Sequence, residues 1–160
     1  MKSKKAQAWG FDIITAMGIF IFGLTIFFLY TINYPNNEEE KLDELLYEGN
    51  IVADSLLSTG FPENWTISSV SRIGLLTNSS IDQNKLEQFY TISSTEYQRT
   101  ISMFGIKYNY FVNFSDSITI SGQPISGIGL FSQSPQNNIK ISRISIYEGK
   151  PVTVEVYVWD

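Results

Sequence analysis

The 160-residue chain contains no cysteine and no histidine. Without cysteine there is no disulfide framework, no thiol nucleophile and no cysteine-ligated zinc or iron–sulfur site. Without histidine, the commonest general base and metal ligand is missing as well. No acidic residue stands in a context that indicates the burial needed for general acid–base work. We therefore expect a protein that is not an enzyme and needs no cofactor.

Basic residues are scarce outside the N-terminus. The formal net charge is −5; the first five residues hold three lysines, whereas from residue 35 onward 15 acidic residues face 8 basic ones. Such an acidic surface argues against nucleic acid as a partner. A domain without disulfides must be held by its apolar core, and a hydrophobic content of 43% is sufficient for one modest domain.

One long apolar run spans residues 11–34, and Asp12 is its only charged residue. A hydrocarbon core of roughly 30 Å needs about 20 apolar residues in a helix, and this run reaches roughly 36 Å at about 1.5 Å per residue. The apolar region of a cleaved secretory signal is shorter, about 7 to 15 residues, and ends in small residues. The length therefore predicts a retained transmembrane helix over residues 11–34.

Charges flank this run asymmetrically. Three lysines, Lys2, Lys4 and Lys5, precede it, and the acidic residues 38–40 follow it. Because basic flanks stay in the cytoplasm, we expect residues 1–10 to be a cytoplasmic leader and the C-terminal domain to lie outside. The predicted localisation is that of a single-pass membrane protein in contact with lipid.

Asp12 lies near the start of the apolar helix, where a carboxylate is costly unless it has a partner. One interpretation places Asp12 at the headgroup edge, where a negative charge favours the N-terminus of a helix. The other gives it an amine of another subunit as a partner, which makes Asp12 a candidate subunit contact. Gly18 and Gly23 lack the G-x-x-x-G spacing, so the sequence gives little sign of a helix-packing face.

A second, amphipathic helix is predicted just after the span. Its segment is 35–60, with the helix itself over 38–59 and Gly60 as a left-handed stop. At about 1.5 Å per residue this helix is roughly 33 Å long, and we expect it to be stalk-like. Pro35 either separates the two helices or kinks one long rod. The apolar residues at helical spacing are Leu42, Leu45, Leu46, Val52, Ala53, Leu56 and Leu57.

Residues 61–160 predict one exterior domain of the α+β class. A short strand is expected at residues 70–76, followed by two short helices. Asp82 and Ser94 are the expected N-terminal caps of these helices, and Gly105 closes the second one.

Strands are predicted for the second half of this domain. Residues 106–114 alternate with the period of a half-buried strand, and residues 118–120 supply another short strand. Residues 121–138 read as an ordered loop with an apolar patch or as an unrecognised strand. The clearest pattern is a hairpin, residues 139–147 and 152–158, around a turn at Glu148-Gly149-Lys150.

Two features of the predicted antiparallel sheet leave alternatives open. A phase shift between Ile141 and Ile144 indicates either a bulge or a strand buried on both faces. With helices covering one face of the sheet, the other face carries Phe111, Tyr157 and Trp159 among polar residues. That face is expected to meet solvent, a neighbouring subunit or a glycan.

Two sets of residues are candidate modification or metal sites. N-x-S/T sequons occur at Asn64, Asn78 and Asn113, of which Asn78 lies in a predicted turn and Asn113 in a predicted strand. Roughly two sequons arise by chance in such a composition, so glycosylation rests on position more than on number. The cluster Glu38, Glu39, Glu40, Asp43 and Glu44 has oxygen ligands for a hard cation but no ligand loop, and a solvated helix start explains it better.

The N-terminus resembles a known family. Lys4-Lys5-Ala6-Gln7, followed by a short stretch and the apolar helix, is similar to the class III signal of archaeal type IV pilin-like proteins. In that family a prepilin-type peptidase removes the basic leader, and the helices then pack into a filament core. The resemblance implies cleavage between Ala6 and Gln7, with the junction before Phe11 as the second choice.

The resemblance also departs from the family at one position. The family often carries glutamate at the fifth mature position, where this chain has Phe11 next to Asp12, or Thr15 under the second choice of cleavage. Residues 49–65 and 73–110 also look like uncharacterised archaeal single-pass membrane proteins, which implies no function. The expected functions are a self-assembling pilin-like subunit or, alternatively, a permanently anchored exterior domain that binds a protein or small ligand.

Overall fold

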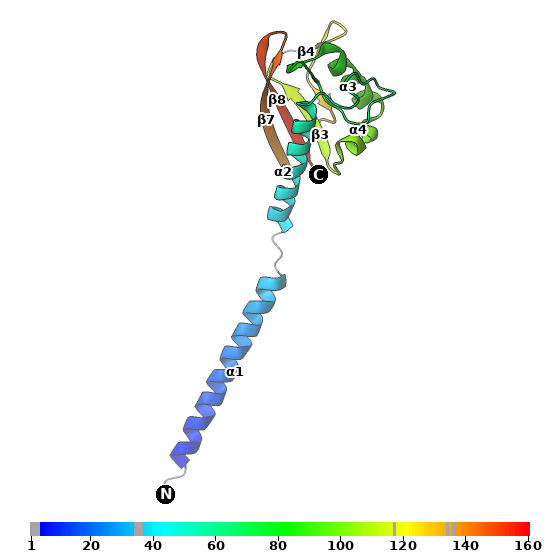
Figure 1. Cartoon of the computed structure of the whole chain (residues 1–160). Helices are drawn as coiled ribbons and strands as arrows, with labels where there is room; N and C mark the ends of the chain where they lie inside the picture. Colours follow the sequence, from blue (N-terminus) through cyan, green and yellow to red (C-terminus); the bar gives the residue numbers. More distant parts are fainter. Residues whose placement is uncertain (1–3, 34–36, 117, 134, 136) are drawn as a thin grey trace. The chain divides into compact units, whose positions relative to one another are not determined.

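The computed structural model describes residues 4–33, 37–116, 118–133, 135 and 137–160, and within the helical ends it describes side chains from Gly10 to Ile32 and from Glu40 onward. The chain divides into two compact units, Met1–Glu38 and Glu39–Asp160, and each is described by itself. The first unit contains the 30-residue helix α1 (Lys4–Asn33) (Figure 1). This helix begins seven residues before the expected span, since the lysines, alanines and glutamine ahead of Phe11 are good helix formers.

The second unit, which we call the head, combines helices with antiparallel strands and confirms the α+β class (Figure 1). It starts within α2, and its sheet elements are short except for the last two. The elements are α2 (Asn37–Leu56), β1 (Leu76–Thr77), β2 (Ser80–Ile81), α3 (Gln83–Thr95), α4 (Tyr97–Phe104), β3 (Asn109–Phe114), β4 (Ile118–Ile120), β5 (Gln123–Ile125), β6 (Ile128–Gly129), β7 (Asn138–Tyr147) and β8 (Lys150–Trp159).

A four-stranded antiparallel sheet in the order β6-β3-β8-β7 is the centre of the head. The predicted hairpin is confirmed: β7 and β8 pair along their full length around Glu148 and Gly149, both with positive φ as a type I′ turn requires. The inward row of β8 is almost completely buried and consists of Val152, Val154, Val156 and Val158. The strand predicted from the alternation at residues 106–114 is confirmed from Asn109 onward.

The helices of the head pack on one face of this sheet, which we call the inner face; the opposite face is the outer face. At Gly49 of α2, an added Cβ would lie 2.9 Å from Ile141 Cγ1, so the helix backbone packs directly on β7. On the other half of the sheet, the Tyr110 ring stands edge-on to Phe104 at 5.2 Å and stacks on Phe89 at 6.3 Å. The Tyr110 hydroxyl is hydrogen-bonded with Thr100 Oγ1 at 2.6 Å, and burial raises the pKa of Tyr110 to about 12.

The helix expected to be stalk-like is part of the head core. In α2, Leu45, Val52 and Leu56 have no exposed surface. Burying three such side chains is favourable by about 1.5–3 kcal/mol each, more than a solvated stalk would gain. The helix also ends at Leu56, three residues before the expected end, and Gly60 (φ +74°) follows as a positive-φ residue.

The strand predicted over residues 70–76 is wrong except at Leu76. Val70, Ile73 and Leu75 are buried, but the backbone N–H groups of Leu75 and Leu76 donate to Leu56 O and Ser58 O, at 2.8 and 2.9 Å. These carbonyls belong to the end of α2, where a helix leaves acceptors unpaired. The segment therefore closes a helix end, and apart from an isolated bridge between Arg72 and Phe61 only Leu76 pairs with another strand.

Both interpretations of the phase shift in β7 are wrong. Pairing with β8 runs without interruption from Ile141 opposite Val156 to Ile144 opposite Thr153, so there is no bulge. The outward residues Ile144 and Ile146 are 77% and 47% exposed, so the strand is not buried on both faces. The apparent shift arises because these isoleucines occupy the solvent face.

Helix caps are confirmed at Asp82 and Gly105 but not at Ser94. Asp82 accepts hydrogen bonds from the N–H groups of Asn84 and Lys85, and Gly105 ends α4 with φ +71°. Ser94 lies inside α3, where its hydroxyl donates to Tyr90 O at 2.7 Å. A serine that bonds back to the preceding turn extends a helix instead of starting one.

Candidate functional site

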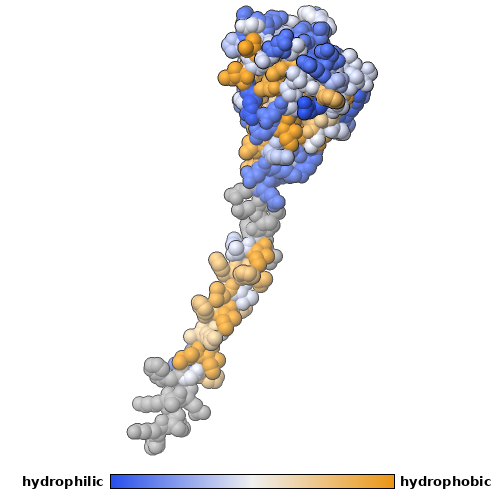
Figure 2. Space-filling view, in the orientation of Figure 1, coloured by the Kyte–Doolittle hydropathy of each residue, from blue (hydrophilic) through white to orange (hydrophobic). Residues whose placement is uncertain are grey.

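The segment Gly10–Ile32 of α1 is a helix long and apolar enough to cross a membrane, with a mean hydropathy of 2.3 and no buried residue in its most apolar part. Figure 2 shows apolar side chains along the described part of this helix. Its threonines satisfy their hydroxyls internally: Thr15, Thr25 and Thr31 donate to the carbonyl four residues earlier at 2.8–2.9 Å. Such internal pairing removes the penalty of an unpaired polar group in hydrocarbon.

Asp12 lies more than two turns inside α1, which begins at Lys4. In the unprocessed chain Asp12 is therefore too far from the helix start to stabilise the N-terminus, because that effect fades within the first turn. Asp12 is exposed and has no hydrogen bond or ion pair with the side chains that the structure describes. It stands at the edge of the apolar segment, two residues after Gly10.

The predicted leader junction, Ala6 and Gln7, also falls inside α1. The side chains at these two positions lie outside the described ones. Cleavage there by a peptidase remains a prediction.

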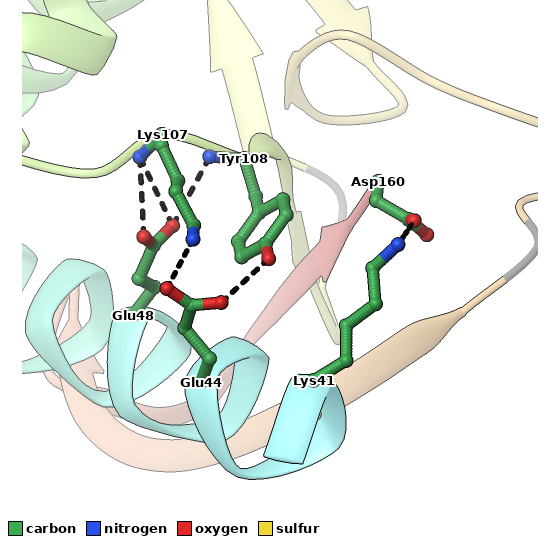
Figure 3. Close-up of polar contacts among 6 residues, drawn as sticks. All are labelled: Lys41, Glu44, Glu48, Lys107, Tyr108 and Asp160. Carbon is green, nitrogen blue, oxygen red and sulfur yellow. Dashed lines mark hydrogen bonds and ion pairs between the residues drawn. The ribbon is translucent and has the colours of Figure 1, made fainter. Parts of the chain in front are cut away.

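A polar cluster fastens α2 to the rest of the head, and Figure 3 shows its six residues. Glu48 is 7% exposed, and its carboxylate accepts hydrogen bonds from the backbone N–H groups of Lys107 and Tyr108 at 3.1–3.2 Å. One turn earlier, Glu44 accepts a 2.7 Å hydrogen bond from the Tyr108 hydroxyl and pairs with the Lys107 ammonium. Lys41 pairs with Asp160. We call these residues the α2 clasp.

The clasp changes the proton affinities of its exposed members. Two hydrogen bonds lower the pKa of Glu44: the one from Lys107 has the largest effect, and the one from Tyr108 has the next largest. The hydrogen bond from Lys41 likewise lowers the pKa of Asp160, and the pKa values of both lysines are raised in return. Each pair thus favours its charged form at neutral pH.

Sequence reasoning missed the clasp, although one signal of it was present. Glu48 is three residues after Leu45 and four before Val52, which places a carboxylate on the buried stripe of the helix. A charge on a core stripe indicates a buried partner, because burying it alone is prohibitive. The partners, backbone N–H groups of Lys107 and Tyr108, carry no sequence signature.

The three sequons lie in different environments. Asn64 is exposed in the loop after α2. Asn78 is exposed in the two-residue turn between β1 and β2, with φ +51°. Asn113 is half-buried on the outer sheet face, and its Nδ2 donates to Glu155 Oε2 at 3.2 Å. Glycosylation is a prediction for all three, and attachment at Asn113 would replace one hydrogen of an amide already engaged with Glu155.

The acidic start of α2 does not form a cation site among the described residues. The side chains of Glu38 and Glu39 are not described, Glu40 and Asp43 are exposed, and Glu44 is held by the clasp. Within the described part of the chain, no group of three or more His, Cys, Asp or Glu residues is placed to hold a metal ion.

A cavity of about 540 Å³ beside α3 is polar, but its main groups serve the fold. The Lys85 ammonium donates to Thr59 O at 2.9 Å and Leu76 O at 2.8 Å. Gln88 Oε1 accepts from the N–H of Ile67 at 3.0 Å, and Asp82 caps α3. These groups hold loops together, whereas the side chains of Asn64, Thr77 and Asn84 in the same lining have no hydrogen bond in the described part of the chain.

No protein-family model, curated protein or solved structure matches this chain. The family membership implied by the N-terminal residues is therefore an expectation from the sequence. Function has to be inferred from the anchor-like helix, the clasp and the head surface.

Proposed function

We propose that this protein is a pilin-like, non-enzymatic structural subunit that α1 anchors in a membrane and joins to other copies in a cell-surface filament or membrane assembly. The observation that carries the proposal is the unburied apolar segment Gly10–Ile32, followed in the chain by a helix that packs on an antiparallel sheet. The leader-like residues Lys4-Lys5-Ala6-Gln7 add the resemblance.

In this proposal the N-terminus begins in the cytoplasm and the head lies outside. The apolar side chains of α1 contact lipid before assembly and neighbouring helices afterwards. Asp12, which has no described partner, would then be satisfied by an amine of another copy. In the head, the clasp joins α2, the first element after the span, to Lys107, Tyr108 and Asp160.

The alternative is a permanently anchored exterior domain that binds a protein or small ligand. In that case α1 meets lipid only, and the leader stays on the chain. The outer sheet face of the head has a groove. This groove favours a binding role of the head, which is compatible with assembly through α1.

The intact mass of the native chain separates the two proposals. Loss of residues 1–6, or of residues 1–10, is expected for a processed subunit, and electron microscopy of shed surface material should then show filaments. The matched variant Ala6→Asp places a charge at the junction and should retain the leader, whereas Ala8→Asp tests whether a nearby charge alone has this effect. Unprocessed wild-type protein confined to membranes would contradict the pilin-like proposal.

Cross-linking tests self-association of α1 directly. The chain has no cysteine, so each single cysteine introduced at positions 17–24 is the only thiol. If copies pack through α1, oxidation should give dimers with a helical period of about 3.6 residues. Uniform, low cross-linking at all eight positions would indicate a helix surrounded by lipid. Ser102→Cys, exposed on α4, controls for random collision.

A further inference from the structure

The outer face of the main sheet is hollowed by a groove of about 620 Å³. Aromatic rings from three elements form its walls: Phe111 of β3, Tyr157 and Trp159 of β8, and Phe131 from the segment after β6. Phe111 and Phe131 stand edge to face at 5.3 Å. The volume lies within the roughly 300–1,000 Å³ of small-molecule sites.

The groove is held in shape by the close approach of the segment around β6. A Cβ added to Gly127 (φ +152°) would lie 2.3 Å from Phe111 Cζ, so this residue has to be glycine for the chain to pass over the ring. Cross-strand register places Phe111 opposite Tyr157, with Trp159 one row further along. The sheet register thus places Phe111, Tyr157 and Trp159 together on one wall of the groove.

Among the residues that the structure describes, the lining contains no charged side chain although the chain is acidic. Its polar members are the amides Asn113, Gln133 and Asn138, the hydroxyls Ser126 and Ser132, and the Tyr157 hydroxyl. The adjoining charges neutralise each other, because Lys140 Nζ and Glu155 Oε1 are 3.0 Å apart. The groove therefore offers nothing to compensate a phosphate, a carboxylate or an ammonium group.

Several polar groups of the lining have unused hydrogen-bonding capacity. Trp159 is only 5% exposed, yet its indole N–H has no hydrogen-bond partner in the described part of the chain. The side chains of Gln133, Asn138 and Ser126 have none there either. No buried side-chain nitrogen or oxygen atom lacks a partner in the described part of the chain, so the Trp159 N–H is itself accessible to solvent although most of the ring is buried. In the cavity beside α3, by comparison, Lys85, Gln88 and Asp82 are already bonded within the fold.

From these observations we propose that the groove binds a neutral sugar unit of a glycan. A sugar ring has C–H-rich faces that pack on aromatic rings and a rim of hydroxyls that pair with amides and an indole N–H. An uncharged lining with both features selects such a molecule over nucleotides and charged peptides. The sugar can belong to a glycan of the chain itself or to another molecule, and the binding chemistry is the same.

The test uses full-length protein in detergent micelles, titrated with N,N′-diacetylchitobiose, mannobiose and maltotriose. NMR spectra resolve the three tryptophan indole N–H signals, and Trp159→Phe identifies the one in the groove. At least one sugar should shift the Trp159 signal saturably, with Kd in the millimolar range or tighter, and leave Trp9 and Trp65 unchanged. No saturable shift with any of the three would overturn the proposal.

A matched pair of variants tests the aromatic wall without unfolding the head. Phe131 is 65% exposed and lies in the groove; Phe61 is 63% exposed and lies outside it. Phe131→Ala should weaken binding about tenfold, as loss of roughly one stacking contact predicts, while Phe61→Ala should not change it. Equal affinities of both variants and the wild type would contradict the assignment to this groove.

Two preparations distinguish the sources of the sugar. Protein made in a host without N-glycosylation is compared with protein from its native membrane. Binding of added sugar by both supports a glycan on another molecule, whereas binding by the unglycosylated protein alone supports a glycan carried by the chain. A Trp159 shift that follows protein concentration without sugar would assign the groove to a second copy and overturn the proposal.

Discussion

The buried carboxylate of Glu48 accepts two hydrogen bonds from the backbone N–H of Lys107, at 3.2 and 3.1 Å, across 59 residues of sequence. The same carboxylate accepts a third hydrogen bond from the N–H of Tyr108. Neither N–H has another partner among the described residues. A side chain of α2 therefore pairs backbone groups just before β3, and it joins the first helix of the head to the sheet.

Removal of this carboxylate should destabilise the head. Glu48→Ala leaves two partly buried backbone N–H groups without their protein partner and should lower the free energy of unfolding by about 1–3 kcal/mol. Glu48→Gln keeps one acceptor oxygen and should lose less. Urea unfolding of the full chain in micelles, followed by tryptophan fluorescence, measures both, with Glu40→Ala on the exposed side of α2 as the control. Equal stabilities of the Ala variant and this control would contradict the assigned role of Glu48.

The clasp predicts how stability depends on pH. The pKa values of Glu44 and Asp160 are lowered in the folded state, so their contribution is present above their unfolded pKa values, about 4, and is lost as pH falls through the folded values. The pKa values of Lys41 and Lys107 are raised, so their contribution is present below about pH 10 and is lost above it. We expect a stability plateau between about pH 5 and pH 10.

A charge-removing variant checks the acid limb of this profile. Glu44→Gln should lose part of the acid dependence and leave the rest to Asp160 and Glu155, whose pKa values are also lowered, as seen in unfolding midpoints measured from pH 3 to pH 6. Glu63→Gln is the matched control, because Glu63 is exposed and has no described ion pair. If Glu44→Gln and Glu63→Gln gave the same profile, the ion pair of Glu44 with Lys107 would contribute nothing measurable to stability in solution.

Two glycines should respond differently to the same substitution. A Cβ at Gly74 would lie 2.2 Å from Gly60 N and 2.5 Å from Ser58 O, both backbone atoms that cannot yield locally. Gly74→Ala should therefore destabilise the head by about 3 kcal/mol or more. At Gly49 the clash is with the Ile141 side chain, which can shift, and alanine in a helix gains about 1 kcal/mol over glycine. Gly49→Ala should stay within about 1 kcal/mol of the wild type by thermal unfolding. A milder effect at Gly74 than at Gly49 would reverse this ranking and contradict the packing described.

The contrast between predicted and observed elements has a physical cause. The hairpin of β7 and β8 was predictable because its alternation and its turn residues are local features of the sequence. The apolar segment of α1 was predictable for the same reason, since its length can be counted directly in the sequence. Residues 70–76 were not, since apolar residues in a buried strand and in a buried helix-closing loop look alike. Where their backbone bonds go depends on the end of α2, which is remote in sequence.

The residues of the groove were likewise predictable only where a local sequence pattern placed them. Phe111, Tyr157 and Trp159 were predicted to share the outer sheet face, and the register confirms it. The groove beside these residues is completed by Phe131. Phe131 lies in a segment whose sequence predicts a loop or an unrecognised strand. Tertiary placement of such a segment has no period to reveal it.

Anchoring by α1 is itself open to a direct test at the middle of its apolar segment. Ile21 and Leu24 are three residues apart on one helical face, midway along Gly10–Ile32. Each arginine at the centre of a span costs about 2.5–3.5 kcal/mol of insertion free energy, so Ile21→Arg with Leu24→Arg should release the protein from carbonate-washed membranes, and either change alone should release a part. Ile144→Arg, at a 77% exposed position on β7, adds the same charge to the head and should leave the protein in the membrane. Retention of the double variant would mean that contacts other than this helix hold the chain there, because no apolar segment with two central arginines remains favourable in hydrocarbon.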